Sequence, residues 1–364
     1  MKIVVYAIAK NESSFVDRWM DSMSEADQVV VLDTGSDDGT AERLRARGAQ
    51  VTVERIVPWR FDRARNRSLE LVPEDADVCV CTDLDEVFHP GWRSALEAVW
   101  TPETRQASYR YTWSFQPDGS EGVVFWQEKI HARRGFRWVH PVHEVLEWVG
   151  EGERGPLALA QGVQLDHHPD PKKSRGQYLP LLELSVAEDP EDDRNLHYLG
   201  REYLYYGRWD DCIRTLTRHL ALPSAVWRDE RAASMRYIAR AHAQKGERDA
   251  ARDWYLRAAA EAPHLREPWT DLAMLLYEDQ EWDGVLYATA CALKIRERPR
   301  TYICEAEAWG SLPHDLRCQA YYHTGRLPQA LEEARLALAA APSDPRLAGN
   351  AELLEKMAGL AGEL

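Results

Sequence analysis

The chain has 364 residues, of which 45 are Lys or Arg and 60 are Asp or Glu, so its formal charge near neutral pH is −15. A hydrophobic fraction of 45% excludes wholesale disorder, and the length is sufficient for two domains with their own cores. No run approaches the roughly 18 to 20 uncharged apolar residues that span a bilayer, and the acidic balance weakens any case for nucleic-acid binding.

The first residues, MKIVVYAIAKNE, pass directly from an apolar strand pattern into polar residues. They lack the longer apolar core and the cleavage site of a signal peptide, so we expect a cytoplasmic location. The cysteines show no CxxC spacing, which predicts reduced thiols that lie mostly in the core. They are Cys79, Cys81, Cys212, Cys291, Cys304 and Cys318.

Apolar strand patterns alternate with helical patterns in the first half of the chain. This alternation predicts a parallel sheet with helices on both faces. Aromatic-rich runs at 108–115 and 123–130 are expected to add antiparallel strands, which gives an α/β domain over residues 1–172. The predicted strands are 3–9, 29–33, 51–56 and 77–85, and the predicted helices are 15–23, 41–48 and 63–71.

From about residue 174 the strand patterns vanish, and helical segments are separated by turns that resemble one another. Gly246 and Gln280 occupy corresponding turn positions 34 residues apart, which is the period of a tetratricopeptide repeat. Two other spacings, of 39 and 45 residues, indicate insertions. We therefore expect an all-α domain over residues 173–364, with about four repeats and a final capping helix.

Tryptophans recur near the repeat turns, at positions 209, 254, 269 and 282. Aromatic residues at helical spacing normally lock one helix pair onto the next, and we favour this interpretation. The alternative is a concave groove for a peptide or a partner helix.

Two acidic residues in the sequence DLDE follow the strand pattern VCVCT. Asp83 and Asp85 are two positions apart, so both side chains can approach a ligand at the carboxyl edge of the sheet. Hard oxygen ligands suit Mg²⁺ or Mn²⁺. The plain alternative is an acidic loop exposed to solvent.

Two further segments are expected to place side chains at the carboxyl edge of the predicted sheet. LDTGSDDGT (32–40) joins a strand to a helix, where Asp33 can accept hydrogen bonds from a ligand, although a simple turn would look the same. RFDRARNRS (60–68) carries Arg63, Arg65 and Arg67, which would neutralise a diphosphate or else form a solvated helix face.

Six short motifs in order resemble the family-2 glycosyltransferases with the GT-A fold. The chain is most similar to the bacterial branch that includes lipopolysaccharide core glucosyltransferases and the tetratricopeptide-bearing S-glycosyltransferases of bacteriocins. The resemblance covers about the first 170 residues. Its motifs are AKNE (9–12), DTGSDDGT (33–40), ARN (64–66), DLDE (83–86), VHE (142–144) and the His pair at 167–168.

This resemblance implies a nucleotide-sugar site, most simply for a UDP-sugar, with Mn²⁺ or Mg²⁺ held by Asp83, Asp85 and His167. Neighbouring His168 is an alternative for the histidine, and Leu84 between the two aspartates is expected to point away. The residues assigned to the donor site are Ala9, Glu12, Asp33, Arg63, Arg65, Asn66, Asp83, Leu84 and His143.

An inverting transfer also needs a base opposite the diphosphate, and Glu144 in HPVHE is our candidate, with Asp85 acting through the metal ion. His143 and His140 would orient this base. Asp166 and Glu86 are alternatives, and a plain helix N-terminal carboxylate is the structural interpretation of Glu144. Trp126 and Trp138 would form either an apolar wall for a sugar or part of the core.

Together these patterns predict a metal-dependent inverting hexosyltransferase. A peptide or protein acceptor beside the repeats ranks first, and a glycan or lipopolysaccharide core ranks second. One alternative is a binding scaffold with a catalytically inactive GT-A domain, and another is a sugar-phosphate nucleotidyltransferase. A homodimer is compatible with the repeats.

Overall fold

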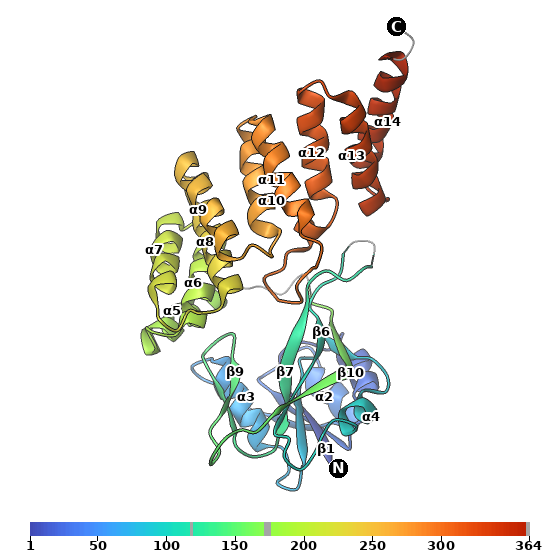
Figure 1. Cartoon of the computed structure of the whole chain (residues 1–364). Coiled ribbons are helices and arrows are strands. Elements are labelled where there is room, and N and C mark those ends of the chain that lie inside the picture. The colour runs from blue at the N-terminus through green and yellow to red at the C-terminus, as the bar shows by residue number, and fades with distance from the viewer. Residues whose placement is uncertain (117–118, 171–175, 362–364) are drawn as a thin grey trace. The chain divides into compact units, whose positions relative to one another are not determined.

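A computed structural model describes residues 1–116, 119–170 and 176–361 (Figure 1). The chain divides into two compact units, Met1–Ser185 and Val186–Leu364. The boundary expected between residues 172 and 173 lies outside the described residues. The described strands belong to the first unit, and repeated helices make up the second.

The first unit contains one large sheet in the order β3-β2-β1-β4-β7-β6-β10-β5 and a separate β8-β9 hairpin. Its strands are β1 (Ile3–Ala9), β2 (Gln28–Asp33), β3 (Gln50–Val53), β4 (Val78–Cys81), β5 (Glu86–Phe88), β6 (Gln106–Thr112), β7 (Val124–Ala132), β8 (Phe136–Val139), β9 (Val145–Trp148) and β10 (Leu157–His167). Strands β1 to β4 pair in parallel, and β7 joins them to β6 through antiparallel pairing. The predicted mixture of parallel and antiparallel strands is confirmed.

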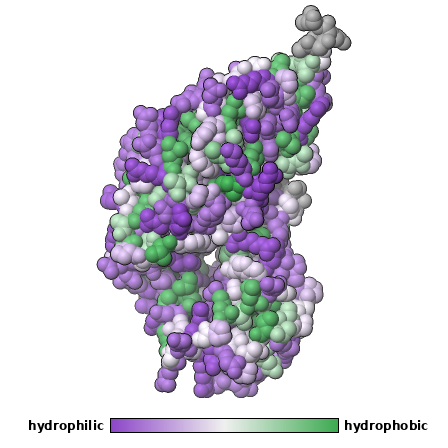
Figure 2. All heavy atoms as spheres, in the orientation of Figure 1, coloured by the Kyte–Doolittle hydropathy of each residue, from purple (hydrophilic) through white to green (hydrophobic). Residues whose placement is uncertain are grey.

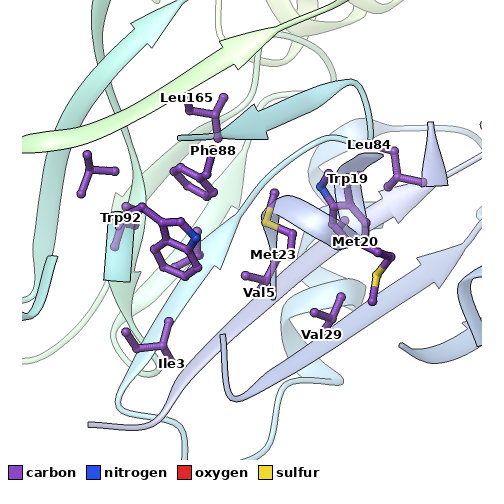
Figure 3. Close-up of a cluster of buried hydrophobic side chains, with 14 of the residues drawn as sticks. Ile3, Val5, Trp19, Met20, Met23, Val29, Leu84, Phe88, Trp92 and Leu165 are labelled. Carbon is purple, nitrogen blue, oxygen red and sulfur yellow. The ribbon is translucent and has the colours of Figure 1, made fainter. Parts of the chain in front are cut away.

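Both faces of β1, β2 and β4 are buried, whereas the edge strand β3 is partly exposed. In β1, Val5 belongs to one apolar cluster together with Trp19, whereas Tyr6 belongs to the cluster on the other face, together with Trp138. Figure 3 shows the first cluster, in which Leu84 and Trp92 also lie. Continuous apolar strands are typical of such a covered sheet, because neither face can be polar.

The helices of the first unit are short. They are α1 (Val16–Ser22), α2 (Thr40–Ala46), α3 (Phe61–Glu70) and α4 (Trp92–Glu97), and α5 (Tyr178–Glu188) crosses the division between the units. Of these, α3 contacts β1, β2 and β8, so it lies against the sheet near the carboxyl end of β4.

The second unit consists of antiparallel helix pairs with a capping helix. The pairs are α6 (Asp193–Tyr205) with α7 (Trp209–Ala221), α8 (Arg228–Gln244) with α9 (Arg248–Glu261), α10 (Glu267–Glu278) with α11 (Trp282–Lys294), and α12 (Leu312–His323) with α13 (Leu327–Ala340), followed by α14 (Pro345–Ala361). The predicted all-α repeat region is confirmed for the described residues. A short 3-10 helix, η1 (Ala306–Trp309), lies between α11 and α12.

The turn inside each pair has the same backbone geometry. Gly207, Gly246, Gln280 and Gly325 all have positive φ, between 58° and 78°. Glycine adopts this conformation without steric cost, whereas Gln280 does so at a cost in strain. The turns that resembled one another in the sequence are therefore the corresponding turns of successive pairs.

Three of the four tryptophans near the repeat turns pack against the buried core of the repeats, as expected. Trp254, Trp269 and Trp282 all pack against one buried cluster that contains Tyr255 and Leu276. On the face of this unit that Figure 2 shows, hydrophilic residues predominate and hydrophobic ones are scattered among them. Among the described residues, no helix combines the length and the apolar character needed to cross a bilayer.

A buried hydrogen-bonded chain links the sheet to the β8-β9 hairpin. The indole of Trp138 donates to the Tyr6 hydroxyl at 2.8 Å, and that hydroxyl contacts Nε2 of His131 at 2.8 Å. Nδ1 of His131 lies 2.8 Å from the Ala132 carbonyl, which can only accept. His131 is thus a neutral imidazole that donates through Nδ1 and accepts through Nε2.

This histidine predicts acid sensitivity of the α/β unit. Burial lowers the pKa of His131 to about 4, below the value of about 6.5 in an unfolded chain. The unfolded state binds the proton first, so the stabilisation is present above about pH 6.5 and is lost as the pH falls toward 4. We expect the free energy of unfolding to fall by up to about 1.4 kcal/mol per pH unit in that window. Urea titrations at several pH values check this, and an equal slope in His131→Phe would contradict it.

Candidate functional site

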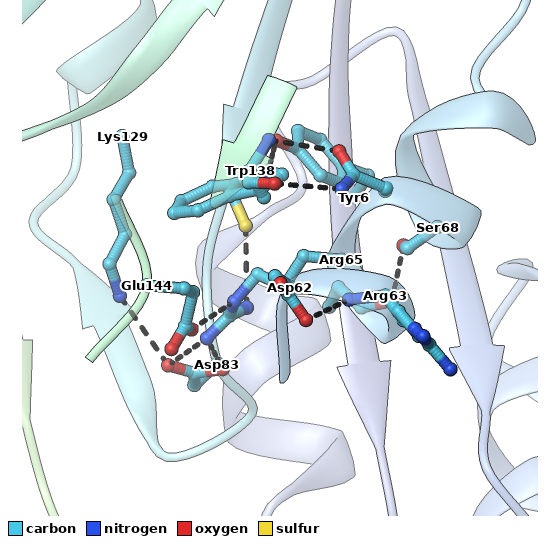
Figure 4. Close-up of polar contacts among 12 residues, drawn as sticks. Tyr6, Asp62, Arg63, Arg65, Ser68, Asp83, Lys129, Trp138 and Glu144 are labelled. Atoms are coloured by element: carbon cyan, nitrogen blue, oxygen red, sulfur yellow. Dashed lines mark hydrogen bonds and ion pairs between the residues drawn. The ribbon is translucent and has the colours of Figure 1, made fainter. Parts of the chain in front are cut away.

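Charged side chains from four parts of the first unit meet at the carboxyl end of β4. Asp83 follows β4, Arg65 comes from α3, Lys129 from β7, and Glu144 immediately precedes β9 (Figure 4). The parallel register of β1 and β4 places this strand end next to the end of β1. Asp83, Arg65 and Glu144 of the predicted site lie at this strand end, whereas Lys129 was not part of the prediction.

Arg65 is the centre of this charged cluster. Its side chain is 4% exposed, and it donates to Glu144 at 2.6 Å and to the two carboxylate oxygens of Asp83 at 2.8 and 3.0 Å. The guanidinium also lies over the Trp138 ring, 5.4 Å from its centroid. Burial alone would lower the pKa of Arg65, but Asp83, Cys81 and Glu144 hold it well above its ordinary value. Arg65 therefore stays charged and neutralises both carboxylates.

Lys129 and Glu86 extend the cluster. Lys129 Nζ lies 3.5 Å from Asp83 and 3.5 Å from Glu86. Glu86 accepts a hydrogen bond from the Tyr111 hydroxyl at 2.8 Å and another from the backbone N–H of Asp83 at 2.8 Å. Burial raises the pKa of Glu86 above its ordinary value, and the positive charge of Lys129 opposes this shift.

Asp85 faces a different partner from Asp83. Its Oδ2 lies 3.4 Å from Nε2 of His167, and its carbonyl accepts from the backbone N–H of His168 at 2.8 Å. A cavity of about 650 Å³ lies beside the two histidines, and Arg18 and Phe115 also line it. The His168 ring stacks on that of Phe115 with centroids 5.4 Å apart.

The fit of a divalent cation to this edge is incomplete. Asp85 and His167 offer two donor atoms near one another, but both oxygens of Asp83 are engaged by Arg65, and Lys129 lies beside them. A cation held jointly by Asp83 and Asp85 would have to displace these two positive groups. Binding of Mg²⁺ or Mn²⁺ by Asp83, Asp85 and His167 stays a prediction.

The three arginines of α3 do not converge. Arg63 is exposed and points away from the cluster (Figure 4), and Arg67 pairs with Glu54 and Glu70. The expectation that all three would supply charge to one site is corrected: only Arg65 does so. Residues two apart on a helix lie about 200° apart around its axis, so Arg63 and Arg67 cannot share the direction of Arg65.

Two other residues of the predicted donor site form hydrogen bonds with backbone groups of neighbouring segments, and a third is part of the apolar core. Asn66 accepts from the Trp138 backbone N–H at 2.9 Å and donates to its carbonyl at 2.8 Å, which fixes β8 against α3. Asp33 accepts from the backbone N–H groups of Gly35 and Ser36 through one oxygen, and thereby closes the strand-to-helix turn. The Leu84 side chain is fully buried in the apolar cluster, as its predicted orientation required.

Ala9 and Glu12 lie at the end of β1, and both are buried. The Ala9 carbonyl accepts from the backbone and side chain of Thr34, and the Glu12 N–H donates to the Thr40 hydroxyl at 2.8 Å. They connect β1 to the neighbouring turn.

The segment around Glu144 differs from a helix terminus. Glu144 precedes a strand, so its interpretation as a helix N-terminal carboxylate is wrong. His143 next to it has a positive φ of 52° and its ring lies 5.7 Å from that of Tyr178. Trp138 is 2% exposed and belongs to the core, whereas Trp126 on β7 is half-buried.

The second unit has its own candidate site, on the first helices of the pairs. Helix α6 contacts α8, and α8 contacts α10, so these helices form a continuous inner layer. Residues 295–311, which we call the crossing segment, lie over that layer. The crossing segment is the insertion that lengthens the spacing between turns to 45 residues.

Three side chains anchor the crossing segment to three helices. Tyr302 stacks on Tyr198 of α6, with centroids 6.0 Å apart. Glu305 pairs with Arg236 and Arg240 of α8 at 2.9 and 2.8 Å. Trp309 donates to Glu267 of α10 at 3.0 Å. The crossing segment is therefore held across the inner layer by an aromatic residue, an acidic residue and a second aromatic residue.

The inner layer is also basic next to these anchors. Arg194 and Arg201 lie over the Tyr198 ring at 5.0 and 4.7 Å from its centroid, and Arg266 lies 4.3 Å from that of Trp309. Cations stacked on aromatic rings favour a ligand that is both acidic and aromatic.

Comparisons with known proteins concern the repeats. The MamA protein crystal structure matches 45% of this chain and 83% of that chain, at 19% identity and a TM-score of 0.37. YrrB, described as a TPR protein with an unusual peptide-binding site, matches 49% and 84% at 13% identity and a TM-score of 0.38. TTC0263, a TPR protein of Thermus thermophilus, matches 49% and 91% at 19% identity and a TM-score of 0.35.

No family model matches the chain, and no curated protein matches it. YrrB and TTC0263 are described as TPR proteins, and none of the solved structures named above is described as a glycosyltransferase. The predicted membership of the family-2 glycosyltransferases is therefore corrected, and with it the predicted hexosyltransferase activity and the classification as an enzyme. Each of the six motifs is short, and residues such as Asp33 and Asn66 have structural partners that explain their presence.

The sequence analysis did not identify Lys129 or the anchors of the crossing segment. A lysine inside the apolar run VVFWQEKI was a usable indication, because a lysine in a buried strand requires a charged partner. The 45-residue spacing was the indication for the crossing segment. Nothing in the sequence indicates which helices that segment contacts.

Proposed function

We propose that the chain is a binding scaffold, and that its repeat unit holds a segment of a partner protein in which an acidic residue lies between two aromatic residues. The crossing segment carries this proposal, because it places one glutamate between two aromatic residues across α6, α8 and α10. A partner would make the same contacts with the inner layer if it carried side chains like those of Tyr302, Glu305 and Trp309 at a similar spacing.

Charge supports an acidic partner. Arg236 is fully buried and Arg240 is half-buried, and both pair with Glu305 as well as with Asp271. A carboxylate between two guanidiniums forms charge-assisted hydrogen bonds, which are among the strongest polar contacts in proteins.

The α/β unit supports the scaffold interpretation as well. Arg65 engages Oε1 of Glu144 and both oxygens of Asp83, so its guanidinium takes up acceptor positions that a general base would use. The GT-A fold of this unit, a cytoplasmic location and a homodimer stay predictions.

A displacement experiment tests the proposed function. A labelled peptide copying residues 298–311 is titrated into the full chain and into a Tyr302→Ala/Glu305→Ala variant, with fluorescence anisotropy as the measurement. The tethered segment competes at an effective concentration in the millimolar range, so the intact chain should bind the peptide weakly. The variant, in which the tethered segment is loosened, should bind it at least tenfold more tightly.

Two further variants sharpen this experiment. Adding Arg240→Gln to the double variant should weaken peptide binding again, whereas adding Arg257→Gln should not, because Arg257 stacks on Trp254 of α9 outside the inner layer. If the double variant loses helical circular dichroism, Tyr302→Ala alone replaces it. Equal peptide affinity in the intact chain and in the loosened variant would refute the proposal.

A further inference from the structure

Three ligand-type side chains from consecutive helices meet inside the second unit. Asp193 lies on α6, His219 on α7 and Glu230 on α8, and one donor atom of each lies within 4.8 Å of the others. Within the described part of the chain, this is the group of His, Cys, Asp and Glu side chains with metal-ligand spacing.

His219 has a buried nitrogen without a hydrogen-bond partner. The side chain is fully buried, and its Nδ1 lies 3.0 Å from the Ser234 hydroxyl. Its Nε2 forms no hydrogen bond with any described residue, and it faces Oε1 of Glu230 at 3.4 Å. That separation is long for an N–H···O hydrogen bond, so this nitrogen calls for another explanation.

The surrounding hydrogen bonds are compatible with a lone pair on that nitrogen. The Ser234 hydroxyl also contacts Nδ1 of buried His197 at 2.8 Å. If Nδ1 of His219 donates to this oxygen, the hydroxyl proton is available for His197. A histidine held by donation from Nδ1 presents Nε2 as a ligand, which is the usual arrangement at metal sites.

We propose that Asp193, His219 and Glu230 bind a divalent transition-metal ion, for which Zn²⁺ is the best suited. Zinc bonds of about 2.0 to 2.2 Å in a tetrahedral arrangement place neighbouring ligand atoms about 3.4 Å apart. The His219 to Glu230 separation has this value, and a ligand atom of the half-buried Asp193 lies within 4.8 Å of both. Three protein ligands leave the fourth position to water.

The ion would connect the first helix pair to the second and would steady the crossing segment. Glu230 accepts a hydrogen bond from the Tyr302 hydroxyl, so the same carboxylate would serve the ion and the anchor. Arg194 acts electrostatically on Glu230, so its positive charge lowers the affinity of this site for a cation.

Calorimetric titration of chelator-treated full chain with ZnCl₂ tests this site. We expect the native chain to bind one Zn²⁺ more than an Asp193→Asn variant does, and its unfolding temperature to rise on addition of zinc. Cobalt(II) should give the visible absorption bands of a four-coordinate site. The result is the number of zinc ions bound by the native chain minus the number bound by Asp193→Asn. An ion bound near Asp85 and His167 would be present in both proteins and would cancel.

A histidine outside the site provides the matched control. His264 is half-exposed and pairs with Asp229 at 2.8 Å, so His264→Gln should bind zinc as the native chain does. His219→Gln should lose the same single ion as Asp193→Asn. Identical titrations of the native chain and Asp193→Asn would overturn the proposal, and so would an imidazolium signal from His219 in zinc-saturated protein by NMR.

Discussion

Replacement of Asp271 by alanine is expected to lower the free energy of unfolding of the repeat unit by about 3–5 kcal/mol. Asp271 accepts from Arg236 at 2.9 Å and from Arg240 at 3.0 and 3.1 Å. Arg236 is fully buried, so loss of this carboxylate leaves a charge in the interior with Glu305 as its remaining partner. Urea denaturation followed by helical circular dichroism measures the change.

An exposed aspartate of the same unit provides the control. Asp283 is 89% exposed and lies 3.8 Å from Arg326, so Asp283→Ala should change stability by less than about 0.5 kcal/mol. A combined Arg236→Met/Asp271→Leu variant should recover much of the loss, since it removes the buried charge together with its partner. A small effect of Asp271→Ala would mean that water solvates Arg236.

Replacement of Arg65 by alanine is expected to destabilise the α/β unit by a similar amount, about 3–5 kcal/mol. The change would leave Glu144 without its guanidinium partner and Asp83 with only Lys129 beside it, and it would remove the contact with the Trp138 ring. Hydrogen exchange of peptides from β1 and β4 measures the effect on this unit separately.

Arg63 is the matched control for Arg65 because it lies on the same helix and is exposed. Arg63→Ala should be nearly neutral. Arg65→Lys should remain clearly destabilised, because an ammonium group cannot contact both carboxylates with the geometry of a planar guanidinium. If Arg65→Lys were as stable as the native chain, the two-sided contact would contribute little.

The local patterns of the sequence predicted the elements well. The apolar runs of β1, β2 and β4 identify buried strands because each strand must pack on both of its faces. The turn glycines at 207, 246 and 325 identify the repeats because their backbone conformation favours glycine. Both properties depend on neighbouring residues, so they are visible without a structure.

The motif-based assignment of activity was wrong for a different reason. Asp83, Arg65 and Glu144 are the residue types of a catalytic site, but the same types also form a neutralised structural cluster. The amino-acid sequence does not distinguish a catalytic site from a neutralised cluster. The difference depends on which carboxylate oxygen each nitrogen of the Arg65 guanidinium contacts. Arg63 shows the same limit, since helix geometry turns it away from the site.

Length, composition and charge excluded disorder and a membrane-spanning run, and periodicity alone determined an α/β half followed by a helical-repeat half. The net charge of −15 did not indicate how the charged residues are arranged, and the tertiary structure decided this. It pairs Arg65 with the carboxylates of Asp83 and Glu144, and it pairs the buried Arg236 with Asp271 and Glu305. It also placed the crossing segment on three helices and brought Asp193, His219 and Glu230 together. Such contacts join residues that are distant along the chain, so no local pattern can specify them.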